Sequence, residues 1–415
     1  MKRWSKENKD SINSSPKYKD FIFAVILSLL NFFFIWPFFG QSYPQAVFPT
    51  PVLPLLARIV EFLTPWNFAQ AVAAFVLLSF PASSLAWYLF FRKLSGNVFL
   101  SFLAGLIFLL PWLYLPRFAL FWQRGDGIHA LGFAVLPLVG IVFIQFLRVG
   151  TPGLFLTSFL GVGLVSLISP FALLNLYFFF LVLTVSEMLL GSARVKILRF
   201  LMVSLFAQSF SSFWYHPEFL FATIRSDQGR EVLSSLWQLF PISLFTVPVF
   251  GAISFLVFDR KPHLQSAFFA FATTTLYFGL VAVENISIHF PLPFPARFYP
   301  EFYIGLALFL AVALNFLIKL PRRGFSLGEI HPHLAFVHHS SELFLTTLLV
   351  AFMVWPVFSL VSGSPVIPQV ASPQVLGVQS ASMEVLPGGI SQMVGYGISF
   401  LTAAAGVFLK MKIKT

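Results

Sequence analysis

The sequence predicts an all-α membrane protein, a polytopic bundle of about twelve transmembrane helices, and three observations lead to this prediction. Only 10% of the 415 residues are charged, whereas soluble domains carry about 25%. Apolar stretches long enough to cross a bilayer recur along the whole chain. Lys and Arg are concentrated in alternate connections between these stretches, as the positive-inside rule requires.

The composition excludes several classes of protein. With 58% hydrophobic residues, 56 of them Phe, the chain cannot cover a soluble globule with solvated groups, so lipid must solvate much of its surface. Cysteine is absent, which removes disulfides, thiolate metal sites and thiol nucleophiles. A net charge of +11 would suit a nucleic-acid partner. The distribution of the basic residues along the chain indicates instead that they set the orientation of the protein in the membrane, so no nucleic-acid partner is expected.

The predicted spans follow a basic tail, residues 1–20, which carries six Lys or Arg and is expected in the cytoplasm. The spans are 21–39, 69–91, 98–115, 128–147, 153–168, 170–190, 200–214, 238–258, 264–283, 302–318, 342–361 and 392–409. Only Ser169-Pro170 separates the fifth from the sixth, so these two are either separate spans or one broken hairpin or re-entrant pair.

One apolar stretch, 52–64, is too short to span, and its Arg58 and Glu61 favour a helix lying at the membrane interface. We divide the chain into the tail, a core over 21–320, and a C-terminal region over 321–415. The last region contains a pair of spans and a polar outer loop, 362–391, whose prolines and small residues predict an extended segment.

The basic residues support this topology. It leaves six of the 26 Lys and Arg outside, all of them Arg: Arg58, Arg117, Arg124, Arg225, Arg230 and Arg297. The other 20, including every Lys, fall in cytoplasmic segments. We therefore expect a multi-pass protein of the cell membrane with both termini in the cytoplasm.

Known catalytic motifs are missing, since the sequence contains no G-x-x-x-x-G-K-[ST], H-E-x-x-H or G-x-S-x-G. Polar residues are instead dense in the outer loops. The loop 116–129 places Arg124, Asp126 and His129 around a predicted helix start. This arrangement has two interpretations. In the first, Asp126 caps the helix and its neighbours anchor the chain at the membrane interface. In the second, Asp126 and His129 form a pair that takes a proton or a cation at the mouth of a cavity.

Two further outer loops contain candidate ligand-binding residues. The loop 213–231 combines Trp214, Tyr215 and His216 with Arg225. It is either an aromatic belt with solvated charges or a binding surface for sugar rings and phosphate. The loop 284–303 contains Arg297 and Glu301, which form either an ion pair or surface charges. Alternatively, Arg297 among aromatic rings binds a lipid-linked phosphate.

A histidine tract lies on the predicted cytoplasmic side, in the sequence EIHPHLAFVHH. It contains His331, His333, His338 and His339, and four imidazoles could bind a metal. Without neighbouring Cys or carboxylates such a tract favours a solvated loop, so no metal site is assigned.

Four segments together resemble a known family. Residues 80–115 (FPASSLAWYLFFRKLSGNVFLSFLAGLIFLLPWLYL) read as paired helices with a short basic turn, and 124–148 begin with RGDGIH. Residues 204–220 place FWYHP at an outer boundary, and 295–311 place Arg-Phe ahead of a span. Over most of 21–320 this order resembles the GT-C type of polytopic membrane glycosyltransferase, in particular its uncharacterised prokaryotic branch.

This resemblance implies transfer of a sugar from a polyprenyl-phosphate donor at the outer face of the membrane. It also implies a catalytic acid in the first outer loop, as base or as ligand of a divalent cation. That loop, 40–68, has Glu61 as its only acid, so Glu61 or Asp126 is the expected catalytic residue. Arg297 or Arg225 would clamp the phosphate. The other expected substrate-binding residues are His129, Trp214, Tyr215, His216 and Glu301.

Two other classes of function fit the same layout. Twelve spans with both ends inside are also typical of carriers, so a transporter or lipid flippase is one alternative. A non-catalytic subunit of a membrane assembly is the other. The sequence leaves the sugar, the acceptor, the oligomeric state and the activity itself open.

Overall fold

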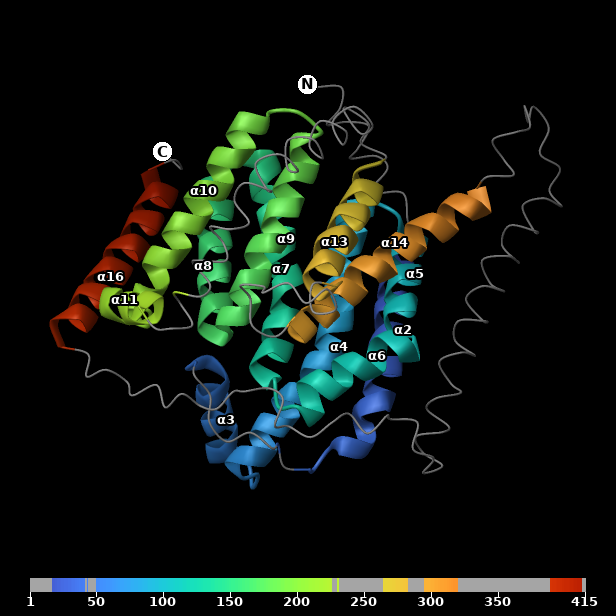
Figure 1. Cartoon of the computed structure of the whole chain (residues 1–415), viewed down its shortest axis with the longest axis horizontal. Helices are drawn as coiled ribbons and strands as arrows, with labels where there is room; N and C mark the ends of the chain where they lie inside the picture. Colours follow the sequence, from blue (N-terminus) through green and yellow to red (C-terminus); the bar gives the residue numbers. More distant parts are fainter. Residues whose placement is uncertain are drawn as a thin grey trace.

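The computed structural model describes residues 17–41, 43, 50–225, 230, 264–282, 295–319 and 389–412. Throughout these residues the regular structure is helical and no strand occurs (Figure 1). The predicted spans 238–258 and 342–361, residues 362–388 of the predicted outer loop and the histidine tract lie outside the described residues, whereas the last three residues of that loop, 389–391, begin the helix α16.

The described part consists of long helices joined by short turns. The α-helices are α2 (Lys17–Ile35), α3 (Val52–Leu63), α4 (Phe68–Ser95), α5 (Val98–Phe108), α6 (Pro111–Phe118), α7 (Gly127–Val149), α8 (Pro152–Ile168), α9 (Pro170–Met188), α10 (Ala193–Phe210), α11 (Pro217–Arg225), α13 (Gln265–Ala282), α14 (Tyr299–Lys319) and α16 (Gly389–Lys412). Shorter helical turns are η1 (Trp36–Phe38), η2 (Ala119–Gln123, a π-helical turn), η3 (Ser211–Phe213) and η6 (Pro295–Phe298).

Five of the described helices are long and apolar enough to cross a membrane. They are Tyr18–Phe38, Phe68–Ser95, Gly127–Val149, Pro170–Met188 and Gly389–Met411. Val98–Phe108 and Pro111–Gln123 add a sixth if this pair, bent by 59°, forms one broken span. Two shorter apolar helices, Pro152–Ile168 and Tyr299–Asn315, stand beside them. The chain is thus a helical bundle with several membrane-crossing helices, whereas the number twelve stays a prediction.

The boundary at Ser169 separates two distinct helices. Ser169 ends α8 and caps α9, because its side-chain oxygen accepts a hydrogen bond from the Ala172 backbone N–H at 3.2 Å. Pro170 then occupies the first position of α9, where a missing N–H is tolerated. α8 has 17 residues, at the lower limit for a membrane-spanning helix, while α9 is long enough.

α7 lies at the centre of the bundle and contacts α4, α8 and α9 (Figure 1). Gly132 allows the closest approach to α9, because a Cβ there would lie 2.4 Å from Cβ of Ala172. At Gly140 a Cβ would lie 2.7 Å from the Phe179 ring. Small residues at such positions let membrane helices pack backbone against backbone.

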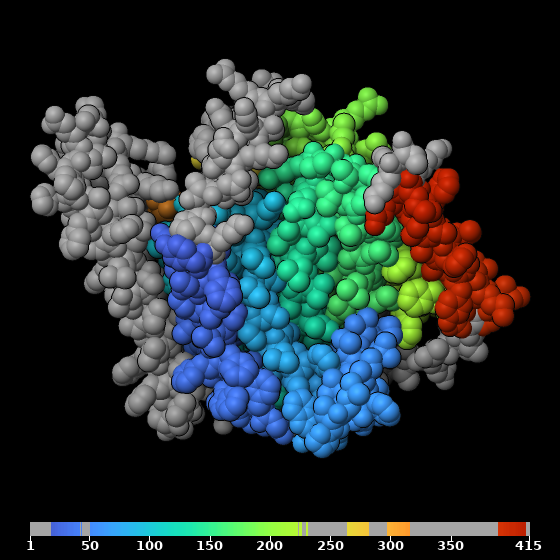
Figure 2. All heavy atoms as spheres, turned by 180° about the vertical axis from the view of Figure 1, so that it is seen from behind, coloured from blue at the N-terminus to red at the C-terminus, as the bar shows by residue number. Residues whose placement is uncertain are grey.

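The outer helices expose apolar side chains, as lipid contact requires. On α16 the exposed fractions are 83% for Ile390, 75% for Phe400 and 68% for Leu401, and Figure 2 shows this helix at the edge of the molecule. On α2, Phe21 is 71% exposed. Large contiguous apolar surfaces are rare on soluble monomers, so these faces fit a hydrocarbon environment.

α3 coincides with the short stretch 52–64. It buries Leu53 and Ala57, while Phe62 is 88% and Leu63 is 72% exposed. A short helix with one packed face and protruding apolar side chains fits a position at the membrane interface.

Candidate functional site

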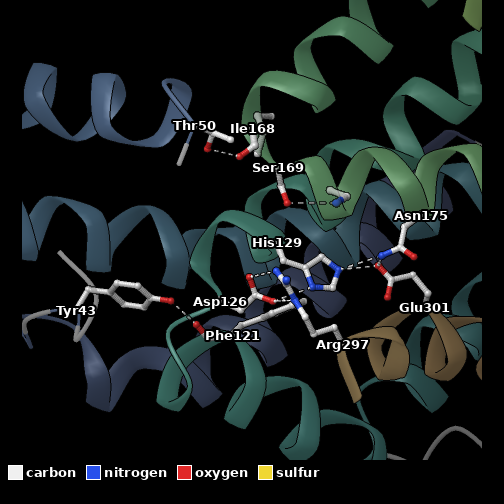
Figure 3. A network of polar contacts seen from close by, with 11 residues as sticks. Tyr43, Thr50, Phe121, Asp126, His129, Ile168, Ser169, Asn175, Arg297 and Glu301 are labelled. Carbon is white, nitrogen blue, oxygen red and sulfur yellow. Dashed lines mark hydrogen bonds and ion pairs between the residues drawn. The ribbon is translucent and has the colours of Figure 1, made fainter. Parts of the chain in front are cut away.

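Five polar side chains from separate parts of the sequence meet at one end of the bundle (Figure 3). Asp126 directly precedes α7 and His129 lies in its first turn. Arg297 comes from η6, Glu301 from the first turn of α14, and Asn175 from the second turn of α9. We call this set the polar cluster. The beginnings of α7, α9 and α14 therefore lie together, as expected if all three start on the same side of a membrane.

The Asp126–Arg297 pair is bidentate. Arg297 Nε donates to Asp126 Oδ2 and Arg297 Nη2 donates to Oδ1, each at 2.8 Å. The Asp126 side chain is 8% and the Arg297 side chain 17% exposed. Two parallel charge-assisted hydrogen bonds in a mostly buried setting fix both groups in position.

His129 lies between two carboxylates. Its Nε2 is 2.8 Å from Glu301 Oε1, and its Nδ1 is 3.4 Å from Asp126 Oδ2, an ion-pair distance without hydrogen-bond alignment. The ring is fully buried, and Glu301 is 2% exposed. If His129 is protonated, the two acids are balanced by two cations, which makes burial of all four groups tolerable.

Asn175 completes the polar cluster from α9. Its Nδ2 donates to Glu301 Oε1 at 2.9 Å, and its backbone carbonyl accepts a hydrogen bond from Tyr277 Oη at 3.1 Å. Asn175 Oδ1 and Glu301 Oε2 are buried without a hydrogen-bond partner in the structure. Buried polar atoms are usually paired, so the cluster has unused hydrogen-bonding capacity.

Aromatic rings enclose the polar cluster. The Arg297 guanidinium carbon lies 4.3 Å from the centroid of the Phe171 ring, a cation–π distance. Phe171 and Phe121 approach the His129 ring edge to face at 4.9 and 5.1 Å. Tyr43 Oη donates to the Phe121 carbonyl at 2.6 Å and so holds this wall in place (Figure 3).

The local sequence explains how Asp126 reaches this position. Gly125 has a φ of +80°, a value that favours glycine. At Gly127 a Cβ would lie 2.5 Å from Val76 and 2.7 Å from Tyr43 Oη, so only glycine fits there. The pattern Gly-Asp-Gly turns the chain tightly into α7 and directs the carboxylate towards η6.

The electrostatics keep Asp126 ionised. Burial raises the pKa of its carboxyl, but the positive charges of Arg297 and His129 lower it by more, so the net pKa lies well below the ordinary value. Although Asp126 occupies the N-cap position of α7, its side chain makes no capping hydrogen bond. The interpretation of Asp126 as a helix cap is therefore wrong, because Arg297 occupies both carboxylate oxygens.

The ion-pair interpretation of Arg297 and Glu301 is also corrected. These residues do not pair with each other among the described contacts, since Arg297 binds Asp126 and Glu301 binds His129. Glu301 is 2% exposed and the Arg297 side chain is 17% exposed, so these residues are not surface charges either. Within the described ranges, no group of three or more His, Asp or Glu side chains is arranged to hold a metal ion.

The remaining candidates from the sequence lie elsewhere. Glu61 forms an exposed ion pair with Arg58 on α3, at 2.6 Å. Arg225 ends α11 with its side chain exposed. Figure 1 shows α10, α11 and α16 on the side of the bundle away from α14.

The aromatic segment 214–216 joins α10 and α11 to their neighbours. Tyr215 Oη donates to the Ser166 carbonyl at 2.6 Å, and His216 Nδ1 lies 3.1 Å from Ser391 Oγ on α16. Trp214 is 40% exposed. No contact described for this segment links it to the polar cluster.

A second group of charges lies at the other end of α7 and α9. Glu187 is fully buried and accepts hydrogen bonds from Arg148 Nη2 at 2.6 Å and Gln265 Nε2 at 2.5 Å, with Lys196 Nζ at 3.5 Å. The 19 steps along the helix from His129 to Arg148, at a rise of 1.5 Å each, cover about 28 Å. This separation is close to the thickness of a bilayer's hydrocarbon core, about 30 Å.

Sequence reasoning missed Asn175, Phe171 and Tyr277. Asn175 is the one strongly polar residue inside the apolar stretch 170–190 ahead of Glu187, and a buried amide in such a stretch is the signal that would have identified it.

The fold and the polar cluster define a class, a helical membrane protein with a buried network of ionisable groups at one end of its helices. The chain matches no protein-family model, no curated protein and no solved structure.

Proposed function

We propose that this chain is a membrane glycosyltransferase that transfers a sugar from a polyprenyl-phosphate donor at the outer face of the cell membrane. The observation that carries the proposal is the bidentate contact between Asp126 and Arg297. It places a candidate base next to a candidate phosphate ligand, at a boundary where three helices begin. The resemblance of the sequence to GT-C enzymes supports the same assignment.

The pairing suggests how donor binding activates the base. A phosphate oxygen competes with the Asp126 carboxylate for the Arg297 fork, because guanidinium binds both in the same bidentate way. When the phosphate takes this position, Asp126 is released but stays ionised beside His129. The carboxylate is then available to accept a proton from an acceptor hydroxyl within hydrogen-bond reach.

The reaction is a displacement at the sugar's anomeric carbon. The acceptor hydroxyl loses its proton to Asp126 as its oxygen forms the new bond to that carbon. The bond between the anomeric carbon and the phosphate oxygen breaks, and its electron pair stays on the polyprenyl phosphate. Arg297 stabilises the charge that develops there. Glu301 binds His129 and so keeps the imidazole beside Asp126.

The assay uses the full chain in liposomes with radiolabelled polyprenyl-phosphate hexoses and a membrane extract as acceptor. Asp126→Asn should lose transfer by about a hundredfold or more, since a positioned base contributes about 10²–10⁴-fold, while donor binding remains. Arg297→Gln should weaken donor binding. Glu218→Gln, which alters an exposed acid on α11, is the matched control, and Glu61→Gln tests the other candidate acid. Full transfer by Asp126→Asn would overturn the proposal.

One observation favours a second candidate, a proton-coupled transporter. A buried histidine between two carboxylates is a common proton carrier in membrane proteins. Uptake driven by a pH gradient and abolished by His129→Gln would support transport, and its absence would favour the enzyme. A non-catalytic subunit would show neither activity.

A further inference from the structure

Arg117 is the most deeply buried arginine among the described residues, with no exposed surface. Its Nε, Nη1 and Nη2 have no hydrogen-bond partner in the part of the chain that the structure describes. Arg297 and Arg148, in contrast, each bind a carboxylate through two nitrogens. A buried cation without a counter-ion is costly in a membrane protein, so its retention needs an explanation.

Three aromatic side chains from three helices surround the guanidinium of Arg117. Its carbon lies 3.8 Å from the ring centroid of Phe108 on α5, 5.0 Å from that of Tyr114 on α6 and 5.7 Å from that of Phe80 on α4. We call this arrangement the arginine cage. Cation–π contacts offset part of the cost of burial, but they leave the N–H donors unused.

Tyr114 adds a further unused donor, because its hydroxyl is also buried without a hydrogen-bond partner. The guanidinium has five N–H donors and the phenol adds a sixth donor, whereas the two oxygens of a carboxylate accept about four hydrogen bonds. A phosphate monoester presents three anionic oxygens and matches this set better. The rings of the cage suit the apolar chain that follows such a head group.

The side chains of the cage are themselves buried, but the helix that carries Arg117 and Tyr114 borders the surface of the protein. α6 is a surface helix, since Trp112 on its other face is 57% exposed. It follows α5 across a 59° bend, so the two helices run in different directions. The cage is also separate from the polar cluster, because the Phe121 ring lies between Phe80 and His129, at 5.9 and 5.1 Å.

We propose that Arg117 and Tyr114 form a second anion site, which binds the phosphate head group of a single-chain or polyprenyl amphiphile from the membrane. The guanidinium and the phenol donate to the phosphate oxygens, and the three rings contact the first carbons of the chain. The site does not depend on the glycosyltransferase proposal, since it shares no residue with Asp126 or Arg297.

The test uses the purified full chain in a neutral detergent, with dodecyl phosphate as the probe. Binding is followed by native mass spectrometry and by the shift of the melting temperature. Inorganic phosphate separates a free anion from an amphiphile, and dodecanoate separates carboxylate from phosphate. All measurements are repeated in an Arg297→Gln background, so that a failure of the proposed catalytic clamp does not affect the result.

Arg117→Met should bind dodecyl phosphate about tenfold or more weakly, since it loses charge-assisted hydrogen bonds. Its melting temperature without ligand should equal or exceed that of the wild type, because a buried unpaired charge is gone. Arg117→Lys keeps the charge without the fork and should bind with intermediate affinity, which tests the site even if the Met variant fails to fold. Arg58→Met, which alters an exposed ion pair, should bind like the wild type.

Unchanged binding of dodecyl phosphate in both Arg117 variants would overturn the site. Equal binding of inorganic phosphate would overturn the amphiphile, and equal binding of dodecanoate would overturn the phosphate. A ligand-free melting temperature that falls in Arg117→Met while binding persists would show a purely structural arginine.

Discussion

The Asp126–Arg297 pair allows a quantitative test of the polar cluster through a double-mutant cycle with Asp126→Asn and Arg297→Gln. Both changes remove the charge of the side chain; Asp126→Asn keeps its shape and Arg297→Gln shortens it. Because the two residues are 171 positions apart in the sequence, their coupling reports tertiary structure alone.

The expected cost of each single change follows from burial. Arg297→Gln leaves a carboxylate that is 8% exposed with only His129 nearby, and an uncompensated buried charge costs about 3 kcal/mol. Asp126→Asn leaves a guanidinium that is 17% exposed and lies over the Phe171 ring. Partial hydration and the ring reduce that cost to about 2 kcal/mol.

The double variant carries neither charge and should lose only about 2 kcal/mol, so the coupling energy is about 3 kcal/mol, at the upper end for contacting residues. The measurement is the free energy of unfolding in mixtures of a neutral detergent and dodecyl sulfate. Additive losses, within about 0.5 kcal/mol, would show that the two side chains do not interact and would refute the geometry of the cluster.

The same pair predicts a pH dependence. The pKa of Asp126 is lower in the folded chain than in the unfolded one, so its contribution to stability is fully present above the ordinary carboxyl pKa of about 4. This contribution should be lost as the pH falls from there towards the folded pKa. In Arg297→Gln the carboxyl has lost the main cause of its lowered pKa, so the loss of stability over this pH range should be smaller, which melting curves recorded between neutral and acidic pH would detect.

Three further predictions concern packing, the second charge cluster and topology. Gly132→Val should lower the free energy of unfolding by about 1–3 kcal/mol, because a side chain there collides with α9; a neutral effect would contradict the close packing. Glu187→Gln should lower the free energy of unfolding by about 2 kcal/mol, as measured by thermal unfolding in detergent. This is less than the full cost of an unpaired charge, because the Arg148 side chain is 33% exposed and can be hydrated. The chain has no cysteine, so single cysteines at Gln123 and Arg194 should react with impermeant maleimide from opposite sides of the membrane, and labelling from one side would contradict the predicted orientation.

Within the described ranges, the sequence predicted most helices well and the contacts between them poorly. Runs of Phe, Leu and Val mark α2, α4, α7, α9 and α16 clearly, because hydrophobic length is a local property. Segments such as 200–214 are harder, since α10 begins earlier, at Ala193, with Arg194, Lys196 and Arg199 in its first turns. Hydropathy alone does not distinguish a span from a helix that starts among charges.

The polar cluster shows the limit of sequence reasoning most clearly. Asp126, His129, Arg297 and Glu301 were all candidates because they interrupt apolar sequence near span ends. Which acid binds which base depends on how α7 and α14 lie in space, and no local pattern contains that information. The sequence therefore favoured interactions between residues close together in the chain, namely a helix cap at Asp126 and an ion pair between Arg297 and Glu301. The fold instead joins residues about 170 positions apart.

The single residue between α8 and α9 sets the angular position of everything that follows on α9. Each residue advances an α-helix by about 100°, and Ser169 is held on both sides, by its own cap and by the bond from Thr50 Oγ1 to the Ile168 carbonyl at 2.7 Å. One extra residue at this point would turn Asn175 away from Glu301 without changing the composition of any helix. The chemistry of the cluster is thus tied to the length of a connection that contains none of its members.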